Sequence, residues 1–120
     1  MKQGTIIQAY KTILKLSGEP LPIRTAHDLY KLRKQLEPQW GFQQEQEMTI
    51  INSLGAEVTE TGQINFKSID DRITFAKKIQ ELLDMDLEVT FDKISIKMED
   101  FNVKITPNEF ESLVDFIDFV

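Results

Sequence analysis

Residues 75–98 read FAKKIQELLDMDLEVTFDKISIKM, and the spacing of their apolar side chains changes halfway along the stretch. Up to Leu83 the apolar residues recur every three or four positions, which is typical of a helix that buries one face. Beyond Met85 they alternate with polar residues, which is typical of strands with one buried face. This change of period within a short chain predicts an α+β fold, with four helical elements and a small antiparallel sheet.

The segment after Met85 contains three short alternating runs. They lie at residues 87–91, 94–98 and 101–105, and the first two would turn at Asp92-Lys93. We therefore expect two or three antiparallel strands in this part of the chain.

The last helix has a clear start signal. Thr106 can cap it, Pro107 suits its first turn, and Glu109 completes a capping box. We expect this helix to continue to the C-terminus, so that a small sheet and a C-terminal helix occupy roughly residues 87–120. Its last turns are rich in apolar residues, Phe116 and Phe119 among them, and should dock on the sheet, on another helix or on another subunit.

A long helix should begin between Pro22 and Thr25, where Thr25 can act as the cap, and should end at Leu54. Its interior proline, Pro38, lacks a backbone donor and clashes with the preceding turn. We therefore expect a kink or a break at residues 37–41.

The long helix and the one that ends near Leu83 should pair antiparallel, as an arm over roughly residues 22–84. Ser68, followed three residues later by an aspartate, predicts the start of the second helix of this arm. Residues 55–67 alternate around a Thr-Gly pair and predict a short hairpin or an irregular turn between the two helices, at the tip of the arm. The polar run at residues 43–47 predicts that the middle of the arm stands in solvent or meets a single neighbour.

An N-terminal helix is expected over residues 5–17, because its apolar side chains recur at helical spacing. Gly18 stands where a left-handed cap would end this helix. Pro20 and Pro22 then turn the chain, since neither can continue a helix.

The composition describes one domain over residues 1–120. The chain has 120 residues, of which 41% are hydrophobic, and it contains no cysteine. The lack of cysteine excludes disulfides, thiolate nucleophiles and cysteine metal sites, and His27 is the only imidazole. We therefore predict a non-enzyme without catalytic, metal-binding or cofactor-binding residues. No apolar run is long enough for a membrane span and no signal peptide is recognisable, which predicts an intracellular protein.

The charge is unevenly distributed along the chain. The net charge is −6, but residues 1–54 hold 7 Lys/Arg against 5 Asp/Glu, while residues 55–120 hold 7 against 15. Such asymmetry can orient a protein against a partner or against copies of itself, and it disfavours nucleic-acid binding through the C-terminal half.

One helical face in the long helix is basic, because its cations recur at spacings of three and four: Arg24, His27, Lys31 and Lys34. A row of cations with nearby aromatic side chains is what a nucleic-acid backbone requires. The alternative is a solvated face, or one that pairs with acidic side chains, which is common on helices opposite an apolar stripe.

Large aromatic residues give a second set of candidates, for a protein partner. Trp40 and Phe42 flank a glycine in a polar stretch, and they are either core residues or an exposed anchor. With Phe116 and Phe119 of the apolar C-terminus they form the predicted partner-binding set.

The acidic run Asp84, Asp86 and Glu88 has the opening spacing of a calcium loop. Val89 and Ser95 stand where that loop needs a glycine and a bidentate glutamate, so no metal site is predicted. The three acidic residues are better read as a solvated helix end that passes into a half-exposed strand.

The order of these features resembles a known family. The resemblance is carried by short segments spread over most of the chain: Leu21-Pro22-Ile23, Leu29, Leu32, Leu36-Glu37, Gly62 to Phe66, Leu82-Leu83, Leu87 to Ile96, and Ile105-Thr106-Pro107 with Glu109 and Glu111. It is similar to the small proteins of unknown function that are encoded by bacteriophages and prophages of Gram-positive bacteria. This resemblance implies a location in the cytoplasm of a bacterial host, and it implies no activity or functional residue.

The leading hypothesis from the sequence is a non-enzymatic interaction or structural accessory protein of phage or prophage origin. It would act through contacts with another protein or with a second copy of itself, as an oligomer. The alternative is a small nucleic-acid-binding accessory protein that uses the basic helix face.

Overall fold

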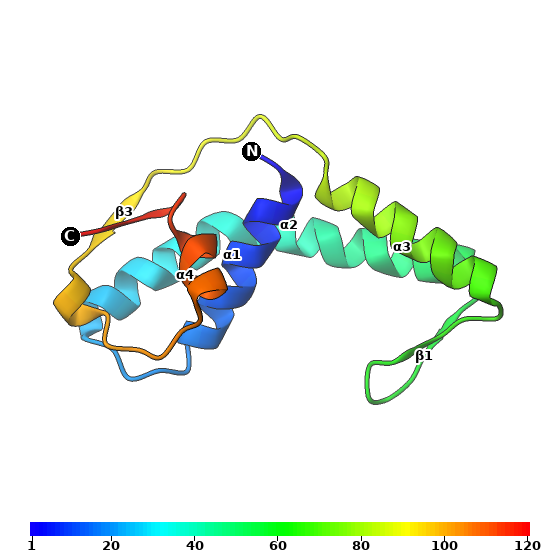
Figure 1. Cartoon of the computed structure of the whole chain (residues 1–120), viewed down its shortest axis with the longest axis horizontal. Coiled ribbons are helices and arrows are strands. Elements are labelled where there is room, and N and C mark those ends of the chain that lie inside the picture. The colour runs from blue at the N-terminus through cyan, green and yellow to red at the C-terminus, as the bar shows by residue number, and fades with distance from the viewer.

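The computed structural model describes residues 1–120 and confirms the α+β fold. The elements in chain order are α1 (Gln3–Leu16), α2 (Ile23–Ser53), β1 (Glu57–Val58), β2 (Ile64–Asn65), α3 (Ile69–Leu83), β3 (Ile94–Ile96), a 3₁₀ turn (Met98–Asp100), α4 (Pro107–Leu113) and β4 (Ile117–Phe119). In Figure 1 the distal half of α2 and α3 run side by side as an arm, away from a body made of α1, the first half of α2, α4, β3 and β4. The arm gives the molecule its elongated shape, with extents of 50 × 32 × 23 Å.

The core of the body lies between α1, the first half of α2 and the C-terminal segments. Helix α1 supplies five of its fully or nearly fully buried apolar side chains: Ile6, Ala9, Tyr10, Ile13 and Leu16. Burial of an aliphatic side chain of this size contributes about 1.5–3 kcal/mol. The ring of Tyr10 also stacks on that of Trp40 with centroids 4.8 Å apart, which fixes α1 against the middle of α2.

Helix α2 runs unbroken through Pro38 for 31 residues, so of the two expected alternatives, a kink or a break, the break does not occur. The kink is present, because the two halves of α2 follow different directions in Figure 1. Pro38 is exposed, while Leu36 and Gln43 on either side of it are buried. Packing of both flanks therefore offsets the backbone hydrogen bond that the proline lacks.

Two predicted helix caps are wrong. Pro22, and not Thr25, occupies the N-cap position of α2, and Thr25 is buried within the helix. The C-cap of α1 is Ser17, in right-handed helical conformation, and Gly18 is not left-handed, since Gly55 and Gly62 alone have a positive φ.

The arm confirms the predicted antiparallel helical hairpin. Strands β1 and β2 pair antiparallel at its tip, and Gly62 makes the turn with a φ of 85°, a conformation that glycine adopts readily. The side chain of Ser68 caps α3 by accepting a hydrogen bond of 3.1 Å from the N–H of Asp71. The polar run at 43–47 does not simply face solvent, because Gln43 is only 2% exposed beside Gln3 of α1.

The sheet of the body differs from the predicted one. Only residues 94–96 of the three alternating runs form a strand, and this strand, β3, pairs parallel with β4. Residues 87–91 and 101–105 have no strand partner, although their alternate side chains pack against the core. In these two runs the alternation of apolar and polar residues therefore reflects burial of one side of the segment, and not pairing between strands.

The C-terminal helix is shorter than predicted. Its capping box is confirmed: the N–H of Glu109 donates to Thr106 Oγ1 over 3.1 Å, and the N–H of Thr106 donates to Glu109 Oε1 over 2.9 Å. The helix ends at Leu113, and the apolar residues after it form a turn and then β4. The predicted docking occurs within the chain, because Phe116 and Ile117 enter the core beside β3.

The N-terminus fastens the arm to the body. The N–H of Gln3 donates to the carbonyl of Met85 over 2.9 Å, and the N–H of Leu87 donates to the carbonyl of Met1 over 2.8 Å. Gly4 permits this approach, since a Cβ at that position would lie 3.1 Å from the carbonyl oxygen of Leu83. The base of α3 is therefore held, while its far end extends from the body (Figure 1).

Candidate functional site

The most exposed apolar helix face of the arm lies on α3. Although α3 has 15 residues, none of its side chains is buried. Helix α3 contacts α2 along the arm, and its inner side carries the half-buried Phe75, Ile79 and Leu82. On the other side Ile69 is 77% exposed and Ile73 is 48% exposed, one helical turn apart.

This outer face continues along the helix. The residues at spacings of four, three and four from Ile69 are Ile73, Ala76 and Gln80, and all are exposed. We call these four residues the outer stripe of α3. The helical spacing up to Leu83 predicts one apolar stripe, which contains Phe75, and the second stripe could have been found because Ile69 and Ile73 do not fit the first one.

The predicted partner-binding residues do not form one surface. Phe116 has no exposed area, which contradicts its assignment as a contact residue. Phe119 is half-buried between the rings of Phe101 and Phe110, with centroids 5.0 Å from each. Trp40 is stacked on Tyr10 at the edge of the core, so the core alternative applies to it. Phe42 alone is exposed, at 37%.

The basic residues of α2 are on the surface, as predicted. Arg24, His27 and Lys31 are exposed and form no ion pair, whereas Lys34 Nζ lies 3.1 Å from Glu37 Oε2. The hydrogen bond to Glu37, and then the charge of the same carboxylate, raise the pKa of Lys34. The cations Arg24 and Lys31 are therefore free, whereas Lys34 is engaged by its own helix.

The surroundings of Arg24 are of mixed charge. Arg24 and Lys97 line a hollow of about 420 Å³ together with Asp28 and Asp100. Carboxylates in this position oppose the approach of a phosphate backbone. On the neighbouring helix α1, Lys15 is not free either, since it pairs with Glu109 over 2.8 Å.

That ion pair joins α1 to α4 and affects the carboxyl group. Lys15 Nζ donates to both carboxylate oxygens of Glu109 over 2.8 Å. The hydrogen bond from Lys15, followed by the one from the N–H of Thr106, lowers the pKa of Glu109. The role of Glu109 is therefore structural, in the capping box and in the contact between helices.

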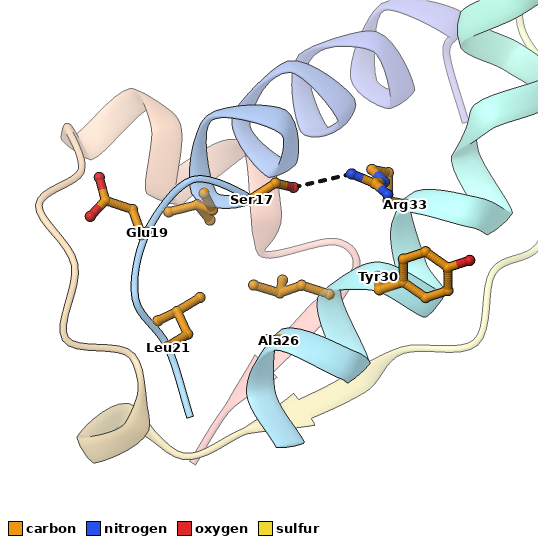
Figure 2. Close-up of a pocket in the computed structure, with 8 residues that line it drawn as sticks. Ser17, Glu19, Leu21, Ala26, Tyr30 and Arg33 are labelled. Carbon is orange, nitrogen blue, oxygen red and sulfur yellow. Dashed lines mark hydrogen bonds between the residues drawn. The ribbon is translucent and has the colours of Figure 1, made fainter. Parts of the chain in front are cut away.

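A small pocket lies between the end of α1 and the start of α2 (Figure 2). In this view Arg33 and Ser17 face one another, and Arg33 Nη1 donates to Ser17 Oγ over 3.4 Å. The guanidinium carbon of Arg33 is 5.4 Å from the ring centre of Tyr30. The cavity measures about 220 Å³. It is smaller than the ~300–1,000 Å³ of typical ligand sites, so it suits no drug-sized ligand.

No group of three or more His, Asp or Glu side chains is arranged to hold a metal ion. No helix combines the length and the apolar character that crossing a membrane takes. No protein-family model, curated protein or solved structure matches the chain.

Proposed function

We propose that this chain is a non-enzymatic interaction protein that acts through its helical arm on another protein chain. The observation that carries the proposal is the outer stripe of α3, where Ile69 and Ile73 are exposed on a helix that buries none of its side chains. Phage or prophage origin, and action in the bacterial cytoplasm, belong to the proposal through the sequence resemblance alone.

A partner that covers the outer stripe gains apolar contact at little cost in ordering. Covering one isoleucine side chain contributes up to about 1.5–3 kcal/mol. The stripe lies on a regular helix, so the partner does not have to order a loop before it binds. An amphipathic helix that presents side chains at this spacing is a common recognition element for another helix or for a groove.

A photo-cross-linking side chain at Ile73 tests the proposal directly. In cells that naturally produce the protein, we expect a covalent adduct with a protein chain after irradiation. The matched control carries the same group at Gln35, an exposed position of α2 in the body, and should give no adduct. A second variant carries the group at Ile69. If neither the Ile69 nor the Ile73 variant gives an adduct, the arm is not an interaction surface.

Nucleic-acid binding is the second candidate, and the free cations of α2 favour it. Residues 1–42 hold 7 Lys/Arg against 3 Asp/Glu, in contrast to the rest of the chain. The measurement is fluorescence anisotropy with labelled single-stranded and double-stranded DNA over a salt series, on the wild type and on a variant with Arg24→Gln and Lys31→Gln. Binding that weakens with salt and with these changes would support the candidate, and no binding at low salt would eliminate it.

A further inference from the structure

The outer stripe of α3 is complementary to itself. Its residues Ile69, Ile73, Ala76 and Gln80 follow the spacing of four, three and four that lets two helices pack along a common line. All four are exposed and lie away from α2. We infer that α3 pairs antiparallel with α3 of a second copy of this chain, around a two-fold axis near Thr74. This inference rests on the proposed function and names the partner of the same arm.

The charges beside the stripe select this arrangement. Asp70 follows Ile69 and Lys77 follows Ala76, so both lie on the same side of the stripe, seven residues apart. When two such helices run antiparallel, the residues on this side face their counterparts, and Asp70 of each copy meets Lys77 of the other. Neither residue forms an ion pair within its own chain. The two-fold pairing therefore gains two ion pairs without breaking any.

The parallel arrangement lacks this complementarity. In a parallel pair, a residue on one side of the stripe meets the residue five positions later on the partner helix. Arg72 would then face Lys77 of the second copy, and two such like-charge contacts would form. Charge alone therefore favours the antiparallel pair.

The apolar residues are suited to the same register. In the antiparallel pair Ile73 lies opposite Ala76 and Ile69 lies opposite Gln80. The small side chain of Ala76 leaves room for the branched Ile73 at the centre, so the two helix backbones can approach closely. At the ends, the aliphatic stem of Gln80 can cover Ile69 while its amide keeps the 3.0 Å hydrogen bond to Asp84 Oδ1.

The size of the contact sets its strength. A helix of 15 residues is about 22 Å long, and one helix pair of this length covers less than the ~1,200 Å² that stable complexes bury. We therefore expect a dimer that forms as the protein concentration rises and dissociates on dilution.

Charge reversal on the purified full chain tests the inference by sedimentation equilibrium. Asp70→Lys alone, and Lys77→Asp alone, should each weaken the dimer about tenfold, because both place like charges opposite one another. An equimolar mixture of the two variants should form a heterodimer. In this pair, position 70 of each variant meets position 77 of the other, and both contacts join opposite charges. Lys78→Asp is the matched control for Lys77→Asp, because it changes the net charge by the same amount on a different face of α3, and it should retain the dimer.

Circular dichroism of each variant separates loss of pairing from loss of folding. A heterodimer in the mixture supports the inference even if one single variant is less stable. A chain that stays monomeric at millimolar concentration, or a dimer that Asp70→Lys and Lys77→Asp leave intact, overturns it. Photo-adducts at Ile73 with a different protein would then leave the proposed function standing, whereas their absence would remove both.

Discussion

Phe116 and Phe42 place the same ring in opposite environments. Phe116 has no exposed area and meets Phe91 edge-on at 5.6 Å, while Phe42 is 37% exposed. Truncation of a buried phenylalanine loses both its transfer free energy and the packing around the cavity that remains. The role of each ring is therefore set by its burial, although both stand in stretches that resembled binding surfaces.

We expect Phe116→Ala to lower the free energy of unfolding by about 3–5 kcal/mol, as measured by urea denaturation. Phe42→Ala is the matched control, and it should cost less than about half as much. Equal effects of the two changes would contradict the burial that distinguishes these rings.

Glu109 links the pH dependence of stability to the contact between α1 and α4. Its pKa in the folded chain is lowered, first by Lys15 and then by the N–H of Thr106. The folded state therefore favours the deprotonated form more than the unfolded state does. The resulting stabilisation is present above the unfolded pKa, and it is lost as the pH falls through the lowered pKa of the folded state.

We expect Glu109→Gln to reduce stability at pH 7 and to have a smaller effect as the pH falls through the lowered pKa of Glu109, where the wild-type carboxyl group also becomes protonated. Urea unfolding of both proteins at several pH values measures the difference. Glu111→Gln, on the exposed side of the same helix, is the control and should follow the wild type. A Glu109→Gln effect that does not vary with pH would show that charge plays no part.

At the scale of elements, α4 depends on its first turn. The helix has only seven residues, and isolated helices of this length are not stable in water. Its capping box satisfies two backbone N–H groups that would otherwise lack partners, and Leu113 anchors its other end in the core. Cap and core contact together define where this helix begins and ends.

Removal of the Thr106 cap of α4 should lower the stability of the protein by a measurable amount. We expect Thr106→Ala to lower the free energy of unfolding by about 1 kcal/mol, because the N–H of Glu109 loses its acceptor. Thr106→Ser keeps a hydroxyl at the same place and should restore most of the loss. If the serine variant were as unstable as the alanine variant, the methyl group and not the cap would be responsible.

At the scale of the whole molecule, stability is unequally distributed. Helix α1 has eight buried side chains, whereas α3 has none. Local opening exposes little apolar surface in α3, so it should require less free energy than opening of the body. We therefore expect the arm to open locally while the body stays folded.

Hydrogen exchange checks this distribution. We expect the backbone amides in the distal half of α3 to exchange faster than those of α1 at low protein concentration. As the concentration rises, pairing of the arms should slow exchange in α3 and leave α1 unchanged. Exchange in α3 as slow as in α1 at high dilution would contradict an independently mobile arm.

The local signals in the sequence were sufficient for several helix boundaries. Ser68 with Asp71, and Thr106 with Glu109, lie within one turn of each other, so their hydrogen bonds form wherever the rest of the chain goes. The α+β class and the helical hairpin follow from the change of apolar period near Met85. The basic face of α2 was predictable as an exposed row, because its spacing is helical and its residues are charged.

Other features depended on segments that are distant in sequence. Residues 114–120 have an apolar pattern that suits a helix, but β3 offers free backbone groups beside them, so the last residues form a parallel strand. Gln43 stands in a polar run and is buried only because α1 brings Gln3 against it. Helical spacing likewise could not show which of the two stripes on α3 would meet α2.

The sequence by itself thus determined where most helices begin, that the fold is α+β, and where the charges lie. The tertiary structure decided which apolar side chains are covered, whether alternating runs find a strand partner, and that Ile69 and Ile73 remain exposed. The physical reason is range: caps, turns and helical periodicity act within a few residues, whereas burial and strand pairing depend on which distant segments meet.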